Sequence, residues 1–123
     1  MGSLKAKFIE VRQLLSERTS WTKRTRARNK VLSDVDPKSD TACAWCLLGA
    51  FERVSDSSLT TISMVNTTLP YVCIGEIPNR AYTYKYVFEF NDAKSTRHAD
   101  VLTLLDKIIA SFDSELTSPS IKV

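Results

Sequence analysis

The clearest pattern of hydrophobic and polar residues lies between residues 90 and 112. Apolar residues recur there with the 3.6-residue period of an amphipathic helix, at Val101, Leu104, Leu105, Ile108, Ile109 and Phe112. Ser95 or Thr96 can cap the first turn, and the preceding Asn91-Asp92 pair favours a chain reversal. The pattern predicts a helix that starts near residue 95 and buries one face against a core.

Three further helices are predicted nearer the N-terminus. Residues 4–17 place apolar side chains at helical spacing, with charged residues between them. Residues 42–54 are apolar almost throughout, which is typical of a buried helix, and Gly49 within it would let another element approach closely. A helix over residues 57–67 follows, and Pro70 ends this region.

A β-hairpin is predicted between the third and the last of these helices. Two apolar segments, residues 71–77 and 81–90, flank a turn at Pro78-Asn79-Arg80. The second segment alternates strictly, so that one face of the strand is aromatic, with Tyr82, Tyr84, Tyr86, Phe88 and Phe90. We expect this face to pack beneath the last helix, and the alternative is that its tyrosines form a stacking platform for bases.

Together these elements predict a small α+β protein that is mostly helical. We expect about four helices, with a short antiparallel β-hairpin packed on the C-terminal helix. The 123 residues suit a single compact domain, 1–123, and residues from about 116 to 123 read as a frayed tail.

Composition narrows the class of protein. The contents of 43% hydrophobic and 25% charged residues are ordinary for a soluble domain. No apolar run reaches the roughly 20 residues that a membrane span needs, and the first residues form a charged amphipathic pattern rather than a signal peptide. An odd number of cysteines, three, fits reduced thiols. We therefore expect a cytoplasmic protein that does not bind membranes.

Positive charge is concentrated in the first 30 residues. They hold nine Lys or Arg residues against two Glu, whereas the whole chain has a net charge of +3. The densest part follows Trp21 and contains Lys23, Arg24, Arg26, Arg28 and Lys30. Such a segment can contact phosphates or an acidic protein surface, with the indole available to stack on a base, and the alternative is a solvated loop. Whether Trp21 faces the core or a partner is left open.

Cysteine-dependent catalysis is a second candidate. Cys46, His98 and either Asp92 or Asn91 are the residue types that a thiolate nucleophile, its base and an orienting group require. Against this, Cys46 falls well inside its predicted helix, where a cysteine usually acts as a small buried hydrophobic residue. His98 then reads as a helix-start residue bonded to the Asn91-Asp92 turn.

A metal site and a cofactor site are also considered. Cys43 and Cys46 form a two-spacer pair, and Cys73 with His98 would complete a zinc-like set of four ligands. Structural zinc pairs usually lie on glycine-rich turns, whereas this pair leads into an apolar helix, so no metal is expected. With only three glycines the chain has no phosphate-cradling loop, and no cofactor is expected.

Several blocks of sequence, taken in order, resemble a family of small bacterial and phage proteins of unknown function. These blocks are Trp21 ahead of Ala27-Arg28, then W-C-L-L-G-A at residues 45–50, and F-N-D at 90–92 followed by T-R-H-A-D-V-L-T-L-L-D at 96–106. The resemblance implies no known reaction. It implies a bacterial or phage origin and draws attention to Trp21, Arg28, Cys46, Gly49, Asn91, Asp92, His98 and Asp106.

The leading interpretation is a non-enzymatic binding protein. Its partner would be a protein or nucleic acid with an acidic surface, engaged by residues 23–30. The alternatives are a small cysteine-dependent hydrolase or transferase using Cys46 and His98, and a nucleic-acid-binding protein proper.

Overall fold

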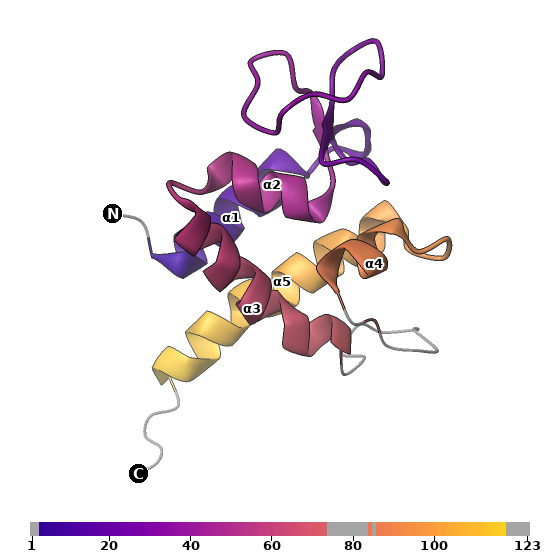
Figure 1. Cartoon of the computed structure of the whole chain (residues 1–123). Helices are drawn as coiled ribbons and strands as arrows, with labels where there is room; N and C mark the ends of the chain where they lie inside the picture. The colour runs from indigo at the N-terminus through magenta and orange to yellow at the C-terminus, as the bar shows by residue number, and fades with distance from the viewer. Residues whose placement is uncertain (1–2, 74–83, 85, 118–123) are drawn as a thin grey trace.

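Helices form the body of the protein, and a very short antiparallel sheet lies beyond one end of it (Figure 1). The computed structural model describes residues 3–73, 84 and 86–117. Within these ranges there are five α-helices, one 3₁₀ turn and two strands: α1 (Leu4–Leu14), η1 (Arg18–Ser20), β1 (Ala27–Arg28), β2 (Ala44–Trp45), α2 (Leu47–Val54), α3 (Ser58–Cys73), α4 (Val87–Asp92) and α5 (His98–Thr117). The prediction of a mostly helical α+β fold is confirmed.

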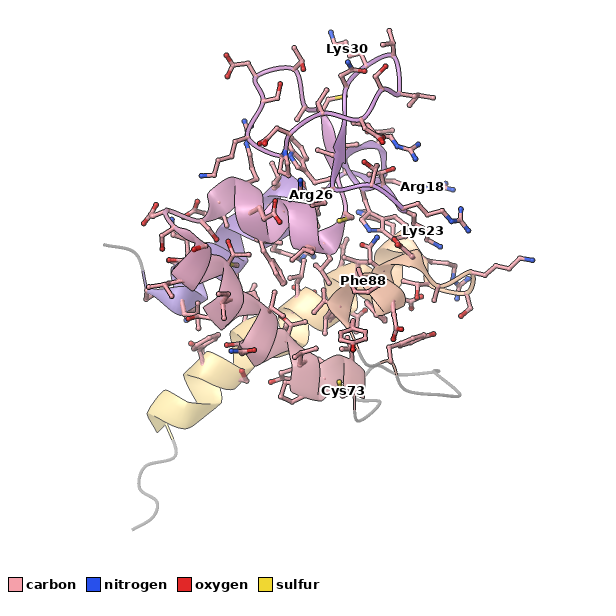
Figure 2. All side chains as sticks on the ribbon, in the orientation of Figure 1. Arg18, Lys23, Arg26, Lys30, Cys73 and Phe88 are labelled. Atoms are coloured by element: carbon pink, nitrogen blue, oxygen red, sulfur yellow. The ribbon has the colours of Figure 1, made fainter. Side chains whose placement is uncertain are left out.

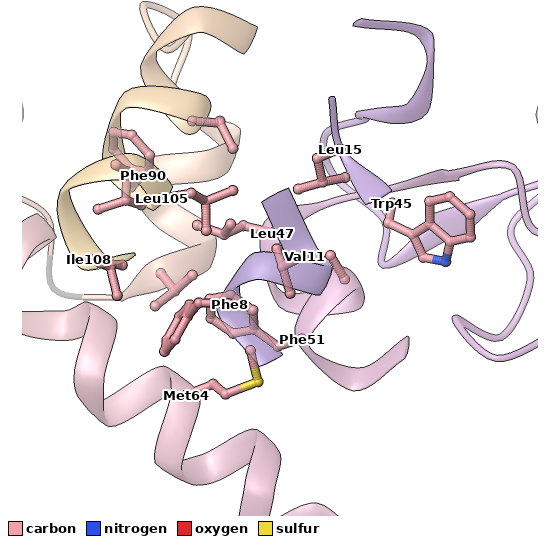
Figure 3. Close-up of a cluster of buried hydrophobic side chains, with 14 of the residues drawn as sticks. Phe8, Val11, Leu15, Trp45, Leu47, Phe51, Met64, Phe90, Leu105 and Ile108 are labelled. Carbon is pink, nitrogen blue, oxygen red and sulfur yellow. The ribbon is translucent and has the colours of Figure 1, made fainter. Parts of the chain in front are cut away.

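The apolar core lies where the helices meet (Figure 3). α1 packs on α5 and α2, and α3 packs on α2 and α4. Each helix contributes fully or almost fully buried side chains, among them Phe8, Val11, Leu47, Phe51, Met64, Val72, Val87, Phe90, Leu104, Leu105 and Ile108. Phe8 of α1 meets Phe51 of α2 edge to face, with ring centroids 5.6 Å apart.

Two of the predicted helices lie close to where the sequence places them. α5 buries Val101, Leu104, Leu105 and Ile108 completely, as its periodicity predicts. α1 begins after Ser3, whose hydroxyl accepts a hydrogen bond from the amide of Ala6 at 3.1 Å. Ser3 is therefore a conventional N-cap, and the amphipathic pattern defines the buried face of α1.

The helix predicted for residues 42–54 begins later than expected. Ala44 and Trp45 instead form β2, which pairs with β1 in the register Ala27 to Trp45 and Arg28 to Ala44. Backbone amides of Cys43 and Cys46 donate to the carbonyls of Arg28 and Arg26, so the segment finds its hydrogen bonds in the sheet and needs no helical turn. The prediction that Cys46 lies well inside a helix is therefore wrong, because Cys46 is the N-cap of α2.

Gly49 does permit the close approach expected of it. A Cβ atom at this position would lie 1.9 Å from the carbonyl oxygen of Arg26, well inside contact distance. α2 thus rests directly on the backbone next to β1, and a glycine is required in its first turn.

The predicted hairpin over residues 71–90 is wrong wherever the structure describes it. Tyr71, Val72 and Cys73 end α3, and Val87 to Asp92 form α4; residues 74–83 and 85 lie outside the described ranges. α4 buries Val87, Phe90 and Asn91, which are spaced i, i+3 and i+4. The aromatic alternation of this segment suits a strand equally well, and the helical burial pattern decides between them only once a core is present. The sheet that the fold does contain joins residues 27–28 and 44–45 and does not form part of a hairpin on α5.

α3 is longer than predicted, because it continues through Pro70 to Cys73. A proline inside a helix removes the hydrogen bond to the carbonyl four residues earlier, here that of Asn66. Both Asn66 and Pro70 are exposed, so water can reach that carbonyl, while Thr68 and Val72 on the opposite side are buried.

The predicted tail from about residue 116 overlaps the end of α5, which runs to Thr117; residues 118–123 lie outside the described ranges. No helix in the described ranges combines the length and apolar character that a membrane span requires.

Candidate functional site

Asn91, at the end of α4, connects segments of the chain that are far apart in sequence. Its Oδ1 accepts hydrogen bonds from the indole Nε1 of Trp21 at 2.7 Å and from the amide of Leu47, the first residue of α2, at 2.9 Å. Its Nδ2 donates to the carbonyl of Thr22 at 3.1 Å and to Oδ1 of Asp92 at 3.0 Å. The side chain is fully buried, so these bonds replace water completely. The sequence predicts Asn91 to be part of a turn, and the family resemblance draws attention to it, but neither indicates these four bonds.

Trp21 is held in place by the same cluster. Besides donating to Asn91, its ring lies 6.0 Å from the ring of His98, and Nζ of Lys23 lies 5.4 Å from the indole centroid. Because its N–H group and the vicinity of its ring are occupied from within the protein, Trp21 serves the fold. These contacts give no support to stacking of Trp21 on a base.

His98, the first residue of α5, is engaged with α1 rather than with the Asn91-Asp92 turn. Its Nε2 lies 2.6 Å from the carbonyl oxygen of Leu15. A carbonyl can only accept, so Nε2 carries the proton in this contact. The interpretation of His98 as a structural helix-start residue holds, but its predicted hydrogen-bond partner was wrong.

Cys46 caps the N-terminus of α2. Its Sγ accepts a hydrogen bond from the amide of Gly49 at 3.2 Å. Such a position favours a thiolate, but burial outweighs the contributions of the amides of Gly49 and Leu48 and raises the pKa of Cys46 above the usual 9.0. The side chain is 5% exposed, so the thiol is protonated and shielded at neutral pH.

The three residues considered for catalysis each have a structural partner. Cys46 bonds to Gly49, His98 to Leu15, and Asp92 accepts the amide of Arg24 at 2.9 Å. Among the described residues no hydrogen bond joins Cys46 to His98. The arrangement therefore gives a cysteine nucleophile neither a deprotonated thiol nor a base bonded to it.

The four residues considered as zinc ligands differ in their surroundings. Cys43 is exposed, Cys46 is buried and Cys73 is half-buried. Within the described part of the chain, no group of three or more His, Cys, Asp or Glu side chains is arranged to hold a metal ion.

The cations of the basic segment 23–30 differ in whether they have partners within the protein. Arg26 forms an ion pair with Glu52, with Nη1 2.8 and 3.0 Å from the two carboxylate oxygens. Arg28 lies 4.0 Å from a carboxylate oxygen of Asp34 and donates to the carbonyl of Lys23 at 3.3 Å. Both arginines therefore have intramolecular partners, which the sequence could not indicate.

Arg24 and Lys30 are different, because both are exposed and their charged groups make no hydrogen bond or ion pair with any described residue. They do not lie together. Figure 2 shows Lys30 on the loops at the end of the molecule that carries the sheet, whereas Lys23, next to Arg24, lies beside α4.

The connection between α4 and α5 adds two more basic residues next to Arg24. Nζ of Lys23 donates to the carbonyl of Ala93 at 2.7 Å, and the amide of Arg24 donates to Asp92, so residues 23–24 lie against the connection between α4 and α5. That connection carries the exposed residues Lys94 and Arg97. We name the resulting surface the basic face, formed by Arg18, Lys23, Arg24, Lys94 and Arg97.

Arg18 is included in this surface because it is exposed and its carbonyl accepts the amide of Trp21, the residue that binds Asn91. Figure 2 shows Arg18 on the same side of the molecule as Lys23. Three carboxylates lie nearby, those of Glu17, Asp92 and Asp100. Asp92 and Asp100 accept the backbone amides of Arg24 and Arg97 respectively, and because the five cations outnumber these three carboxylates, the surface is net positive.

Arg18, Lys94 and Arg97 are absent from the binding residues predicted from sequence. For Lys94 and Arg97, proximity to Lys23 and Arg24 depends on hydrogen bonds between residues 70 positions apart, such as Lys23 to Ala93. No local pattern reports such contacts. The one sign in the sequence is that basic residues follow the Asn91-Asp92 turn at positions 94 and 97.

Comparison with known proteins gives one result. A model described as a family of unknown function, DUF6197, matches residues 3–111. No curated protein and no solved structure matches the chain.

Proposed function

Since the chain belongs to DUF6197, a family of unknown function, we propose a function from its own surface: the protein binds an anionic macromolecule through the basic face. The observation that carries the proposal is the set of exposed guanidinium and ammonium groups on Arg18, Arg24, Lys94 and Arg97, which make no hydrogen bond or ion pair with the described residues. A charge that the protein does not neutralise itself is available to an oppositely charged partner.

The contacts beneath the basic face support the same proposal. Asn91, Asp92 and Trp21 fix the backbone of residues 21–24 against the connection between α4 and α5. The cations are thus carried by segments that the core holds in place, and less conformational entropy is lost when a partner binds. Arg24 has a φ of 67°, which a non-glycine residue rarely adopts, and the bond from its amide to Asp92 stabilises that conformation.

A pair of matched variants tests the proposal. R24Q/K94Q removes an arginine and a lysine from the basic face, and R26Q/K30Q removes the same two charge types from elsewhere. Binding to a polyanion, measured by fluorescence anisotropy at low salt with heparin as the probe, should fall at least about 10-fold for R24Q/K94Q and much less for R26Q/K30Q.

The substituted side chains of R24Q/K94Q are exposed, so its melting temperature should match that of the unmodified protein. Equal losses in the two variants would show that binding follows net charge and not this surface. Absence of heparin binding at low salt would refute the proposal.

A further inference from the structure

Two aromatic side chains near the start of α4 are exposed and stacked on each other. Tyr86 is 50% and Phe88 48% exposed, and their rings are nearly parallel, with centroids 5.3 Å apart and an interplanar angle of 8°. Large aromatic side chains usually gain most by leaving water. Here one pair remains at the surface, whereas Phe90 on the same helix is fully buried.

This pair lies one helical turn from Asp92, which borders the basic face. Phe88 and Asp92 are four residues apart on α4, so they share a side of the helix and are about 6 Å apart along its axis. Asp92 in turn accepts the amide of Arg24. Figure 2 shows Phe88 on α4 and Lys23 beside the other end of that helix.

The combination of cations and a stacked aromatic pair fits one chemical class of partner. Single-stranded nucleic acids bind proteins through phosphates on basic side chains and through bases stacked on aromatic rings. Successive phosphates of a strand are about 3.4 Å apart along a stacked helix, so the roughly 6 Å from Phe88 to Asp92, which accepts the amide of Arg24, corresponds to about two nucleotides. In a duplex the faces of the bases are already stacked and cannot reach the rings.

On this basis we propose that the anionic partner is a single-stranded nucleic acid, with phosphates over Arg24 and Lys94 and bases stacked against Tyr86 and Phe88. This inference rests on the proposed function and makes it specific. Glu89 is also exposed on α4. Since its carboxylate repels phosphates, the strand is expected to pass on the side of Arg24.

The test compares four probes with the full-length protein: a fluorescent oligothymidylate of about 12 nucleotides, near the site sizes known for such grooves, a duplex of equal length, heparin, and poly-glutamate. Anisotropy titrations at low salt should rank the single strand above the duplex. The double variant Y86A/F88A should lose at least about 10-fold in affinity for the single strand, because each stacked base contributes substantially. Its affinity for heparin, which has no bases, should stay unchanged.

The matched control is L59A/I62A, which removes two exposed apolar side chains of α3 away from the basic face. It should bind the single strand as the unmodified protein does. If Y86A/F88A does not fold, as judged by circular dichroism, Y86L/F88L keeps apolar side chains without aromatic rings and should show the same selective loss.

The outcomes separate this inference from the proposed function. Equal affinity for single strand and duplex, or no effect of the aromatic substitutions, would overturn the nucleic-acid inference while heparin binding upholds the basic face. Preference for poly-glutamate over the oligonucleotide would point to an acidic protein and overturn it as well. If none of the polyanions binds, both the proposed function and the nucleic-acid inference are refuted.

Discussion

At the scale of single residues, the buried amide of Asn91 has the most partners in different segments. It holds the indole of Trp21, the carbonyl of Thr22, the start of α2 at Leu47, and Asp92. An Asn side chain offers both an acceptor oxygen and two donor hydrogens, and all are used here. Neither Asp nor Leu, which are similar in size, can satisfy the same set of groups.

We therefore expect Asn91→Ala to lower the free energy of unfolding by about 2–4 kcal/mol, since several buried donors and acceptors lose their partner. Urea unfolding followed by circular dichroism measures this. The control is Asn66→Ala, at an exposed position of α3, which should change stability by no more than about 0.5 kcal/mol. Equal effects of the two substitutions would show that the Asn91 bonds contribute little.

Cys46 gives a residue-scale prediction about reactivity. Burial raises its pKa, so at pH 7.5 iodoacetamide should modify exposed Cys43 and leave Cys46 unmodified until the protein is denatured, as peptide mass spectrometry can show. At about pH 7.5 an exposed thiol with an ordinary pKa already reacts with iodoacetamide. Rapid modification of Cys46 in the folded protein would instead reopen the case for catalysis.

The raised pKa of Cys46 also has a consequence for stability. The folded state holds the thiol proton more tightly than the unfolded state, so stability is unaffected well below the usual pKa of 9.0 and declines as the pH rises above it. Cys46→Ser lacks a group that titrates in this range. Its stability should therefore change less than that of the unmodified protein between about pH 8 and 10.

At the scale of elements, the contact between α2 and β1 depends on having no side chain at Gly49. Cys46 caps α2 and also donates its amide to Arg26, so the first turn of the helix is drawn against the strand backbone. The elements of the N-terminal half are thereby joined through backbone atoms, whereas α1 and α5 are joined through side chains such as Phe8 and Phe112.

Gly49→Ala tests this contact. Alanine favours a helix by about 1 kcal/mol over glycine, yet its Cβ would overlap the carbonyl oxygen of Arg26. We expect a net loss of about 2 kcal/mol or more, in the range of overpacking substitutions. Ser63→Ala, at an exposed position of α3, should be neutral or slightly stabilising by thermal unfolding. If Gly49→Ala were instead more stable than the unmodified protein, α2 could move away from the carbonyl of Arg26 at little cost in free energy.

At the scale of the whole molecule, the proposed binding of an anionic partner depends on how charge is distributed over the surface, more than on the net charge. The net charge is only +3, and Arg26 is neutralised by Glu52. Four of the exposed cations that make no hydrogen bond or ion pair with the described residues, Arg18, Arg24, Lys94 and Arg97, lie on segments 18–24 and 94–97, which the core brings together.

Salt dependence measures how many of these charges act together. If four cations contact phosphates of a single strand, the slope of log affinity against log salt concentration should be about −3. R24Q/K94Q should reduce its magnitude by about 1.4, roughly 0.7 for each cation removed. An unchanged slope in that variant would place the phosphates elsewhere on the protein.

Sequence alone determined the elements whose side chains repeat with a clear period. α1 and α5 follow from their apolar spacing because burying one face of a helix is the main source of its stability. The sequence also predicted that another element approaches the helix closely at Gly49, since a glycine in an otherwise apolar helix usually indicates such a contact. The same reasoning failed at residues 42–46 and 87–92, where hydrophobic side chains suit either a strand or a helix.

Tertiary structure determined the secondary structure of those two segments and which residues form the basic face. Residues 43–46 became extended because the backbone of residues 26–28 supplied partners for their amides, and α4 became helical because the core accepted Val87, Phe90 and Asn91. Arg26 is paired with Glu52, whereas the exposed residues Lys94 and Arg97 lie beside residues 23–24 and join the basic face. Hydrophobic periodicity is a local property of the chain, whereas these pairings depend on which distant groups the folded core places within hydrogen-bonding distance.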